Sequence, residues 1–200
     1  MMLIGLTGGI AAGKSAVSSF LKEQHIAVID TDEIARRLTQ PGNAGEEALK
    51  RVFPARFFPQ NTLDRQKLAR YCFSSLARTD KLNRTLHPLI QDEVTRRLAQ
   101  MQEEPFVVLD VPLLFEAGWD KLCDRVIVVE CDRETRIARA MARDGLTRRE
   151  VEARMARQAS DETRRRGADY RIDNSGTEQE TRAQVGDLIR ILKKEGAKPE

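Results

Sequence analysis

The clearest chemical signal lies near the N-terminus, in the eight residues GGIAAGKS at positions 8–15. Their spacing is G-x-x-x-x-G-K-S, and they stand between an apolar run and a helical pattern. In this context the backbone N–H groups of a glycine-rich turn bind phosphate oxygens, and the positive end of the helix dipole strengthens the binding. The pattern predicts a phosphate-binding loop made of Gly8, Gly9, Ala11, Ala12, Gly13, Lys14, Ser15 and Ala16.

Two side chains of this loop have expected roles in nucleoside triphosphate chemistry. Lys14 is expected to reach the β- and γ-phosphates, and the Ser15 hydroxyl is expected to hold Mg²⁺. Asp110 ends the apolar run 106–110, and a carboxylate at that place can hold the hydration shell of the same ion. The structural alternative is a loop aspartate bonded to nearby backbone N–H groups. The cofactor that these residues indicate is ATP with Mg²⁺.

A pair of carboxylates, Asp30 and Asp32, follows the apolar run 26–30. In open α/β sheets, ligands bind at the carboxyl ends of the strands. Asp32 is therefore a candidate to orient an acceptor hydroxyl and to accept its proton late in phosphoryl transfer, with Asp30 in a supporting role. The structural alternative is that Thr31 or Asp32 caps the helix that begins near Ile34.

The segment from Arg133 to Arg166 is rich in arginine, with eleven arginines, no lysine and six acidic residues. This excess of positive charge favours a polyanionic ligand, and nucleotide phosphates satisfy it. The segment has no Phe, Tyr or Trp, whereas nucleic-acid binders stack bases on aromatic rings, so we expect no nucleic-acid partner. Arg139 and Arg143, four residues apart on one helix face, are the candidates to neutralise charge in the transition state.

Two further polar residues are ambiguous from their position alone. His87 precedes Pro88, and such a histidine is more often packed or capping than catalytic. Asn174 follows the last apolar run and is a candidate to contact the adenine base. A plain Asn-Ser-Gly turn explains Asn174 equally well.

The elements that must position these residues follow an α/β pattern. Short apolar runs alternate with helical stretches, which predicts parallel strands buried on both faces, at 3–7, 26–30, 106–110, 125–130 and 170–172. Residues 33–102 contain no convincing strand and are expected to form helices interrupted by prolines, namely Pro41, Pro54, Pro59 and Pro88.

Three regions are therefore expected. A nucleotide-binding core takes residues 1–32, 103–138 and 168–200, and a helical region takes residues 33–102. An arginine-rich lid takes residues 139–167. The lid segment is poor in apolar residues, so we expect a mobile flap without a firm hydrophobic stripe.

Composition limits the class of protein. The 200 residues suffice for one sizeable hydrophobic core, and the net charge of +3 is small. No apolar run is long enough to span a membrane, so we expect no membrane association. The three cysteines have no CxxC spacing, and together with the lack of a signal peptide they predict a reducing, cytoplasmic location. No obligate protein partner is indicated.

With these residues assembled, the chain closely resembles the dephospho-CoA kinase family over nearly its whole length. The phosphate-binding loop is common to many kinases, but the order and spacing of the full set of motifs are specific. The shared motifs are GLTGGI at 5–10, GKS at 13–15, DTD at 30–32, IAR at 34–36, HPLI at 87–90, DVPLLFE at 110–116, RQ at 157–158 and NSG at 174–176.

The resemblance implies a P-loop kinase core, with a five-stranded parallel sheet flanked by helices, a helical insertion that binds dephospho-CoA and a helical lid. It implies ATP-dependent phosphorylation of the ribose 3′-hydroxyl of dephospho-CoA to give coenzyme A and ADP, the last step of coenzyme A biosynthesis. By position, Asp32 matches the family's proposed base, and His87 falls on the motif of the substrate region. Asp110 and Leu113 are expected to contact the substrate as well.

Three residues depart from the family's usual pattern. Ala11 and Ala12 stand where Gly-Ser is more common, and Thr31 stands where alanine is usual. Alanine at position 11 is tolerable only if its φ is negative, because a Cβ penalises the left-handed region. We expect at most an altered affinity for ATP. Thr31 adds a hydroxyl and removes no carboxylate.

Other functions remain open at this point. One is another P-loop small-molecule kinase, acting on a nucleoside or a nucleoside monophosphate, although the motifs at 87–90 and 110–116 argue against it. A GTPase is disfavoured because the chain has no N-K-x-D motif. A non-catalytic ATP-binding switch is the alternative from another class. Catalysis is favoured over it by the joint presence of Lys14, Ser15, Asp32 and Asp110.

Overall fold

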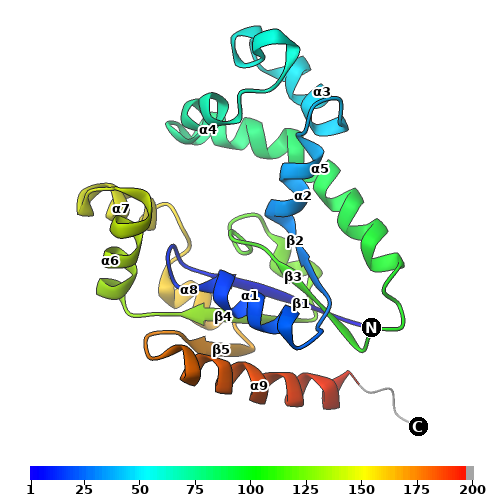
Figure 1. The fold of residues 1–200 in the computed structure, drawn as a ribbon, viewed down its shortest axis with the longest axis vertical. Coiled ribbons are helices and arrows are strands. Elements are labelled where there is room, and N and C mark those ends of the chain that lie inside the picture. Colours follow the sequence, from blue (N-terminus) through cyan, green and yellow to red (C-terminus); the bar gives the residue numbers. More distant parts are fainter. Residues whose placement is uncertain (197–200) are drawn as a thin grey trace. The chain divides into compact units, whose positions relative to one another are not determined.

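The computed structural model describes residues 1–196. Contacts between Cα atoms divide the chain into two compact units (Figure 1). The first, which we call the sheet unit, comprises residues 1–29 and the chain from residue 101 onward; the second, the helical unit, comprises residues 30–100. Residues 139–167 belong to the sheet unit, and their action as a separate lid stays a prediction, as do the predicted domain boundaries. The last four residues of the predicted core lie outside the described range.

A five-stranded sheet forms the centre of the sheet unit, with the strand order β2-β3-β1-β4-β5. Parallel pairing joins β1 to both β3 and β4, and β4 to β5. The predicted α/β fold with a five-stranded parallel sheet is confirmed. The strands are β1 (Met2–Gly8), β2 (Val28–Asp30), β3 (Phe106–Asp110), β4 (Arg125–Glu130) and β5 (Tyr170–Asp173).

Two helices, α1 (Lys14–Glu23) and α9 (Glu178–Glu195), bury their apolar faces in the main core of the sheet unit. They contribute Phe20 and Leu21 from α1, and Leu188 and Leu192 from α9, against sheet residues such as Ile4. With Val17, the residues of α1 follow an i, i+3, i+4 spacing, and those of α9 are four apart, so each set lies on one helix face against the sheet. This packing fixes the start of α1, and with it the end of the phosphate-binding loop.

The segment after β3 packs closely against Gly5 of β1. A Cβ at Gly5 would lie 3.0 Å from both the Leu114 side chain and Cys123 Sγ, so glycine gives this segment room to approach. Leu114 and Trp119, on either side of Gly118, are buried here, and Trp119 begins the short helix η3 (Trp119–Leu122). The close fit holds the chain that follows Asp110 against the central strand.

Four helices make up most of the helical unit: α2 (Thr31–Leu38), α3 (Ala44–Val52), α4 (Arg65–Phe73) and α5 (Leu76–Ala99). Short 3₁₀ turns, η1 (Ala55–Phe57) and η2 (Pro59–Asn61), connect α3 to α4. Pro41, Pro54 and Pro59 lie between helices as predicted, but the prediction that Pro88 interrupts a helix is wrong, because α5 runs through it. A proline removes one backbone donor, yet α5 continues through Pro88 while it packs against α2, α3 and α4.

A buried carboxylate, Glu46 of α3, organises the chain that precedes α4. Its side chain is 1% exposed and accepts hydrogen bonds from Gly42 N and Leu63 N, each at 2.8 Å. Lys50 Nζ donates to it at 3.2 Å. The Gly42 N–H is the main reason that the pKa of Glu46 lies below its usual value, and burial opposes it. Glu46 therefore ties two loops of the helical unit to one helix.

Replacing Glu46 with alanine is expected to destabilise the helical unit by about 3 kcal/mol, because two partly buried N–H groups and Lys50 lose their acceptor. Glu47→Ala is the matched control, since Glu47 is exposed on the same helix and its carboxylate pairs with Lys50 at 2.9 Å. Because the pKa of Glu46 is lowered on folding, its stabilisation is present above the unfolded pKa and is lost as the pH falls through the folded one. Urea unfolding measures both effects, and equal losses in the two variants would contradict this role.

A second ion-pair network holds α2 against α5. Glu93 of α5 pairs with Arg96 at 2.8 Å, with Arg97 at 3.0 Å and with Arg37 of α2. The hydrogen bond from Arg96 is the main reason that the pKa of Glu93 falls to about 2. The network fixes the helix that carries Asp32 within the helical unit.

The arginine-rich segment folds as α6 (Arg133–Asp144), α7 (Arg148–Met155) and α8 (Asp161–Arg166). The expectation that it lacks a firm apolar contact is wrong. Ile137, Ala140 and Val151 are buried together, and Ile10 and Ala11 of the phosphate-binding loop pack against them. The buried apolar residues of α6 and α7 thus lie where these helices touch the loop.

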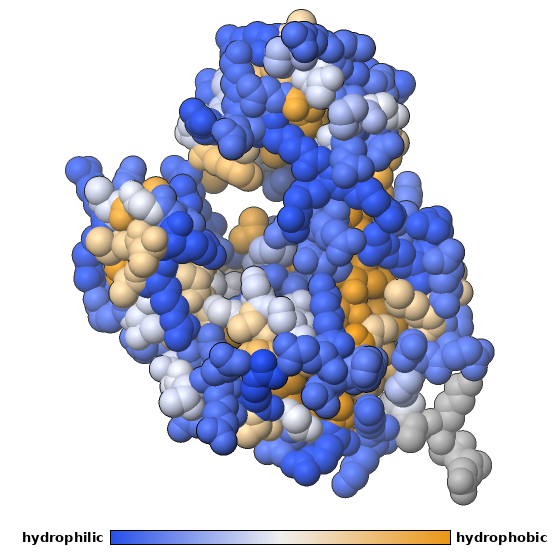
Figure 2. All heavy atoms as spheres, in the orientation of Figure 1, coloured by the Kyte–Doolittle hydropathy of each residue, from blue (hydrophilic) through white to orange (hydrophobic). Residues whose placement is uncertain are grey.

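The surface is largely hydrophilic on the face that Figure 2 shows. This agrees with a chain in which 32% of the residues are charged. Within residues 1–196, no helix combines the length and the apolar composition that a membrane span requires.

Candidate functional site

The predicted phosphate-binding loop connects β1, which ends at Gly8, to α1, which begins at Lys14. Gly13 precedes the helix with φ of 92°, a conformation that favours glycine. A Cβ at this position would also lie 1.8 Å from Asn174 Nδ2, so glycine is required for space as well. The strand, turn and helix have the order that the sequence predicts, and Ser15 and Ala16 lie in the first turn of α1.

The expectation that Ala11 has a negative φ is wrong. Its φ is 55°, in the left-handed region. Ala12 N donates to Gly9 O at 3.0 Å, which closes a turn with Ala11 at its third residue, the place where type II turns require a positive φ. The Ala11 methyl group packs against the apolar cluster of α6 and α7, and this contact offsets part of the strain. Ala12 is 1% exposed in the main core and is not among the described residues with positive φ.

The strain at Ala11 predicts a difference between two alanine-to-glycine substitutions. At Ala12 the change loses a buried methyl group and adds backbone freedom to the unfolded chain, so about 1.5 kcal/mol of unfolding free energy is lost. At Ala11 the same losses are offset by about 1–2 kcal/mol of relieved strain, so Ala11→Gly leaves the stability within about 1 kcal/mol. Chemical denaturation of both variants measures the difference. Equal destabilisation would show that Ala11 carries no strain.

Lys14 and Asp110 lie in direct contact, Lys14 Nζ against Asp110 Oδ1. Both are largely buried, Asp110 at the end of β3 and Lys14 at the start of α1. Pairing with β1 places the end of β3 beside the loop, with Leu6 opposite Asp110. The structure thus brings together two residues that are 96 positions apart. Lys14 was predicted to reach the phosphates of the nucleotide, and Asp110 to hold the hydration shell of the accompanying Mg²⁺.

The side chain of Asn174 is fixed between the loop and α9. Its Nδ2 donates to Ala12 O at 2.8 Å, and its Oδ1 accepts from the Thr181 hydroxyl at 2.9 Å. The backbone N–H of Asn174 donates to Glu130 O at 2.8 Å, at the end of β4. Its contact with adenine stays a prediction, but its carboxamide has a second task, which is to hold the phosphate-binding loop.

Replacing Asn174 with alanine is expected to weaken ATP binding about 10-fold, because Ala12 O loses its donor and the loop loses a fixed position. The probe that separates the two roles is inorganic triphosphate, which has no base. If Asn174 acts by holding the loop, triphosphate binding weakens by the same factor as ATP binding. Weaker ATP binding with unchanged triphosphate binding would instead assign the effect to the adenine. Calorimetric titration of both ligands, with Ser175→Ala as a neighbouring control, makes the comparison.

The two arginines predicted to act on the transition state have different surroundings. Arg139 Nη1 donates to Asn174 O at 3.2 Å and contacts Cys131 Sγ at 3.5 Å, so Arg139 lies close to the residue that holds the loop. Arg143 forms a bidentate pair with Asp144, at 2.8 and 3.0 Å. Their catalytic roles stay predictions.

Three residues beside the loop were not assigned a role from the sequence. Gln158 Oε1 accepts a hydrogen bond from Ile10 N at 2.8 Å. Arg136 and Arg164 are buried next to Gly9, where an added Cβ would lie 2.1 Å from Arg136 Nη1. A signal for Gln158 was present in the shared motif at 157–158, but among eleven arginines nothing in the sequence marks these two as buried.

Asp30 and Asp32 take different places at the start of α2 in the helical unit. Asp30 is the N-cap, and its carboxylate accepts from Asp32 N at 2.9 Å and from Glu33 N at 3.1 Å. The alternative that Thr31 or Asp32 caps the helix is therefore wrong. Asp30 thus fixes the first turn of the helix that carries Asp32, and its supporting role in phosphoryl transfer stays a prediction.

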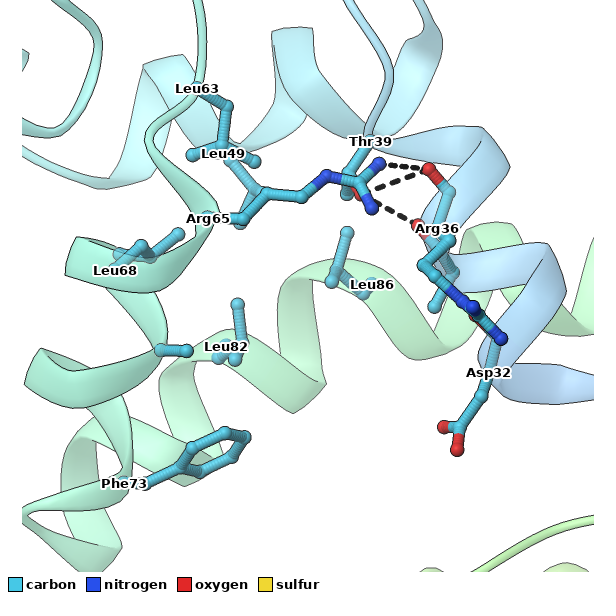
Figure 3. A pocket seen from close by; sticks show the side chains of 12 residues that line it. Asp32, Arg36, Thr39, Leu49, Leu63, Arg65, Leu68, Phe73, Leu82 and Leu86 are labelled. Atoms are coloured by element: carbon cyan, nitrogen blue, oxygen red, sulfur yellow. Dashed lines mark hydrogen bonds between the residues drawn. The ribbon is translucent and has the colours of Figure 1, made fainter. Parts of the chain in front are cut away.

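A cavity of about 460 Å³ opens in the helical unit beside Asp32 (Figure 3). Leucines from three elements line it, and Phe73, which is largely exposed, stands at one side. Arg65 reaches from α4 to the backbone of Arg36 on α2, where its guanidinium donates to the carbonyl oxygen. The cavity joins an apolar wall to polar groups, and its principal lining residues are Asp32, Arg36, Leu49, Leu63, Arg65, Leu68, Phe73, Leu82 and Leu86.

The other residues predicted to contact the substrate do not line this cavity. His87 follows the lining residue Leu86 on α5 but does not itself line the cavity, and burial lowers the pKa of His87. Leu113 is exposed in the sheet unit, shortly after Asp110. Substrate contacts by His87, Asp110 and Leu113 stay predictions.

Comparison with known proteins gives consistent matches over nearly the whole chain. The sequence profile of the family described as "CoaE: Dephospho-CoA kinase" matches residues 2–180. A dephospho-CoA kinase of Symbiobacterium thermophilum is 47% identical over 188 residues, which cover 92% of this chain and 79% of the relative. A second dephospho-CoA kinase, from Corynebacterium glutamicum, is 38% identical, and the match covers 94% of this chain and 96% of the relative. The crystal structure of TT1252 from Thermus thermophilus superposes with a TM-score of 0.83 at 35% sequence identity. The superposition covers 95% of this chain and 96% of TT1252.

Proposed function

This chain belongs to the dephospho-CoA kinase family and is an enzyme that phosphorylates dephospho-CoA in coenzyme A biosynthesis, and from that premise we propose how its residues divide the work. The loop at 8–16 binds the phosphates of ATP, with Lys14 on the terminal phosphates. Asp32 orients the ribose 3′-hydroxyl of dephospho-CoA and accepts its proton. The products are coenzyme A and ADP.

The observation that carries this proposal is the contact of Lys14 with Asp110 beside a glycine loop that ends in a helix N-terminus. A buried ammonium next to backbone N–H groups is a site for a polyanion, because both interactions favour negative charge. Asp110 holds Lys14 in place and keeps the local charge balanced. The rate of phosphoryl transfer then depends chiefly on the positioning of the two substrates and on electrostatic stabilisation, since the loose transition state needs little help from a general base.

The donor set suits Mg²⁺ as the accompanying ion. Among the described residues, no group of three or more His, Cys, Asp or Glu side chains gathers to hold a metal. Mg²⁺ in nucleotide sites is typically held by one or two carboxylates or hydroxyls, with substrate phosphates and water completing its shell. Ser15 and Asp110 would supply the protein's share, and the ion would neutralise charge on the phosphates.

The cavity beside Asp32 is the proposed site for dephospho-CoA. Its leucine wall suits the alkyl parts of the pantetheine arm, and Arg36 and Arg65 suit the diphosphate. Asp32 then stands at the polar side, where a ribose hydroxyl can be held. The cavity thus offers groups of matching chemistry to the pantetheine arm, the diphosphate and the ribose hydroxyl.

The experiment that tests the proposed function is ADP release from Mg-ATP with different acceptors. Dephospho-CoA, AMP, UMP and uridine are compared in parallel with a sample without acceptor. We expect ADP formation above the background only with dephospho-CoA. Turnover with another acceptor alone would reassign the cavity, and ATP binding without turnover on any acceptor would favour the non-catalytic switch.

A further inference from the structure

Arg136 of α6 and Arg164 of α8 lie directly over the phosphate-binding loop. They are 5% and 7% exposed. A Cβ added to Gly9 would come within 2.1 Å of Arg136 Nη1 and 3.0 Å of Arg164 Nη2, so both guanidinium groups pack on the loop backbone at this position. Two buried cations are therefore placed at the loop in addition to Lys14.

The carboxylate of Asp161 pairs with both guanidinium groups. Asp161 Oδ2 accepts from Arg136 Nη2 at 2.9 Å, and Asp161 Oδ1 accepts from Arg164 Nη2. The Asp161 side chain is 52% exposed, unlike the arginines that it joins. Glu130, which lines the same small cavity, is engaged by Arg165 at 2.8 Å. The pair of buried guanidiniums keeps one positive charge in excess.

The hydrogen-bonding capacity of the pair is also incompletely used. Nε of Arg136 is buried, and no atom of residues 1–196 accepts a hydrogen bond from it. Arg164 Nη1 donates to Ala159 O at 2.6 Å, which fixes the guanidinium plane. The cavity beside them measures about 20 Å³, enough for about one water molecule. A larger anion would therefore reach the two guanidinium groups at the place of the Asp161 carboxylate, whose side chain is 52% exposed.

We propose that Arg136 and Arg164 bind the terminal phosphate of ATP and that Asp161 competes with this phosphate for the two guanidinium groups. The inference rests on the proposed function, since it takes the loop to be the ATP site. The terminal phosphate carries the highest charge of the three and has three free oxygens, which match two guanidinium groups better than one carboxylate does. Asp161 then acts as an internal competitor that lowers the affinity for a triphosphate more than for a diphosphate.

The test is a calorimetric titration of the whole protein with Mg²⁺ and either AMP-PNP, a non-hydrolysable triphosphate, or ADP. Asp161→Asn keeps the shape and removes the charge, so we expect about 10-fold tighter AMP-PNP binding and little change for ADP. Arg164→Gln is expected to weaken AMP-PNP binding about 10-fold, again with little change for ADP. The matched control is Arg166→Gln, because Arg166 is exposed on the same helix and pairs with Glu162.

The ratio of the two affinities decides the outcome. A purely structural role of the Asp161 pair predicts lower stability and the same AMP-PNP to ADP ratio, and that result would overturn the inference. If a variant is less stable, its melting temperatures with saturating AMP-PNP and with ADP report the same ratio. If the unaltered protein binds neither nucleotide, the proposed function fails first; if it binds both and the ratio does not move in Asp161→Asn, only the inference fails.

Discussion

Asp32→Asn is expected to lower kcat for coenzyme A formation by roughly 100- to 10,000-fold, the range typical for loss of a positioned acid or base. The asparagine keeps the size of the side chain but cannot take the proton of the acceptor hydroxyl. Because Asp30, and not Asp32, caps α2, the substitution leaves the helix start intact. Binding of ATP, measured by calorimetry, should stay within about 3-fold, since Asp32 has no assigned contact with the nucleotide.

The matched control for this variant is Glu33→Gln, an isosteric change at the next residue of the same helix turn. Glu33 is exposed and lies 3.9 Å from Arg97. Its replacement should leave kcat within about 2-fold, as for a surface ion pair. Turnover that is unchanged in Asp32→Asn would remove Asp32 from the mechanism. A loss that appears only in the KM for dephospho-CoA would make Asp32 a binding residue.

Lys14→Met is expected to lower both ATP affinity and turnover. Loss of the charge-assisted contacts to phosphate should weaken ATP binding roughly 10- to 100-fold, and the rate should fall a further 100-fold or so because the transition state loses the same charge. Methionine keeps the apolar stem, so packing at the start of α1 is preserved. Initial rates over a range of ATP concentrations separate the two effects.

Stability must be followed in the same variant. Lys14 neutralises Asp110, which is almost fully buried, and removal of one partner of such a pair costs about 3 kcal/mol. Adding Asp110→Asn should restore part of the stability but none of the rate. Lys22→Met, an exposed lysine in the last turn of α1, is the control for a change of charge. Full activity in Lys14→Met would contradict the assignment of the loop.

The sequence predicts well what is local. Apolar runs predict the central strands β1, β3 and β4, because a strand buried on both faces needs such a run whatever surrounds it. At the edge of the sheet, β5 follows a weaker pattern at 170–172 and has one buried residue. The G-x-x-x-x-G-K-S spacing likewise predicts the strand, turn and helix of the loop, because each of its glycines meets a backbone requirement. The predicted limits of β3 and β4 match the structure, and those of β1, β2 and β5 differ by one or two residues, as at β2, which begins at Val28 and not at Ile26.

What depends on distant residues could not be predicted. The left-handed φ of Ala11 results from a turn that packs on α6 and α7, more than 120 positions away, and those contacts carry part of its cost. Asn174 meets Ala12 across 162 positions, so its place against the loop is visible only in three dimensions. The sequence around Arg136 and Arg164 does not differ in composition from the sequence around the exposed arginines nearby. Only folding decides which guanidinium groups are buried.

The central claim is that the protein transfers a phosphoryl group from ATP to the ribose 3′-hydroxyl of dephospho-CoA. The most direct measurement is mass spectrometry of the product from dephospho-CoA and from its 2′-deoxy and 3′-deoxy analogues, each incubated with Mg-ATP. We predict a gain of one phosphate for dephospho-CoA and for the 2′-deoxy analogue, and none for the 3′-deoxy analogue. Phosphorylation of the 3′-deoxy analogue, or none of dephospho-CoA itself, would contradict the claim.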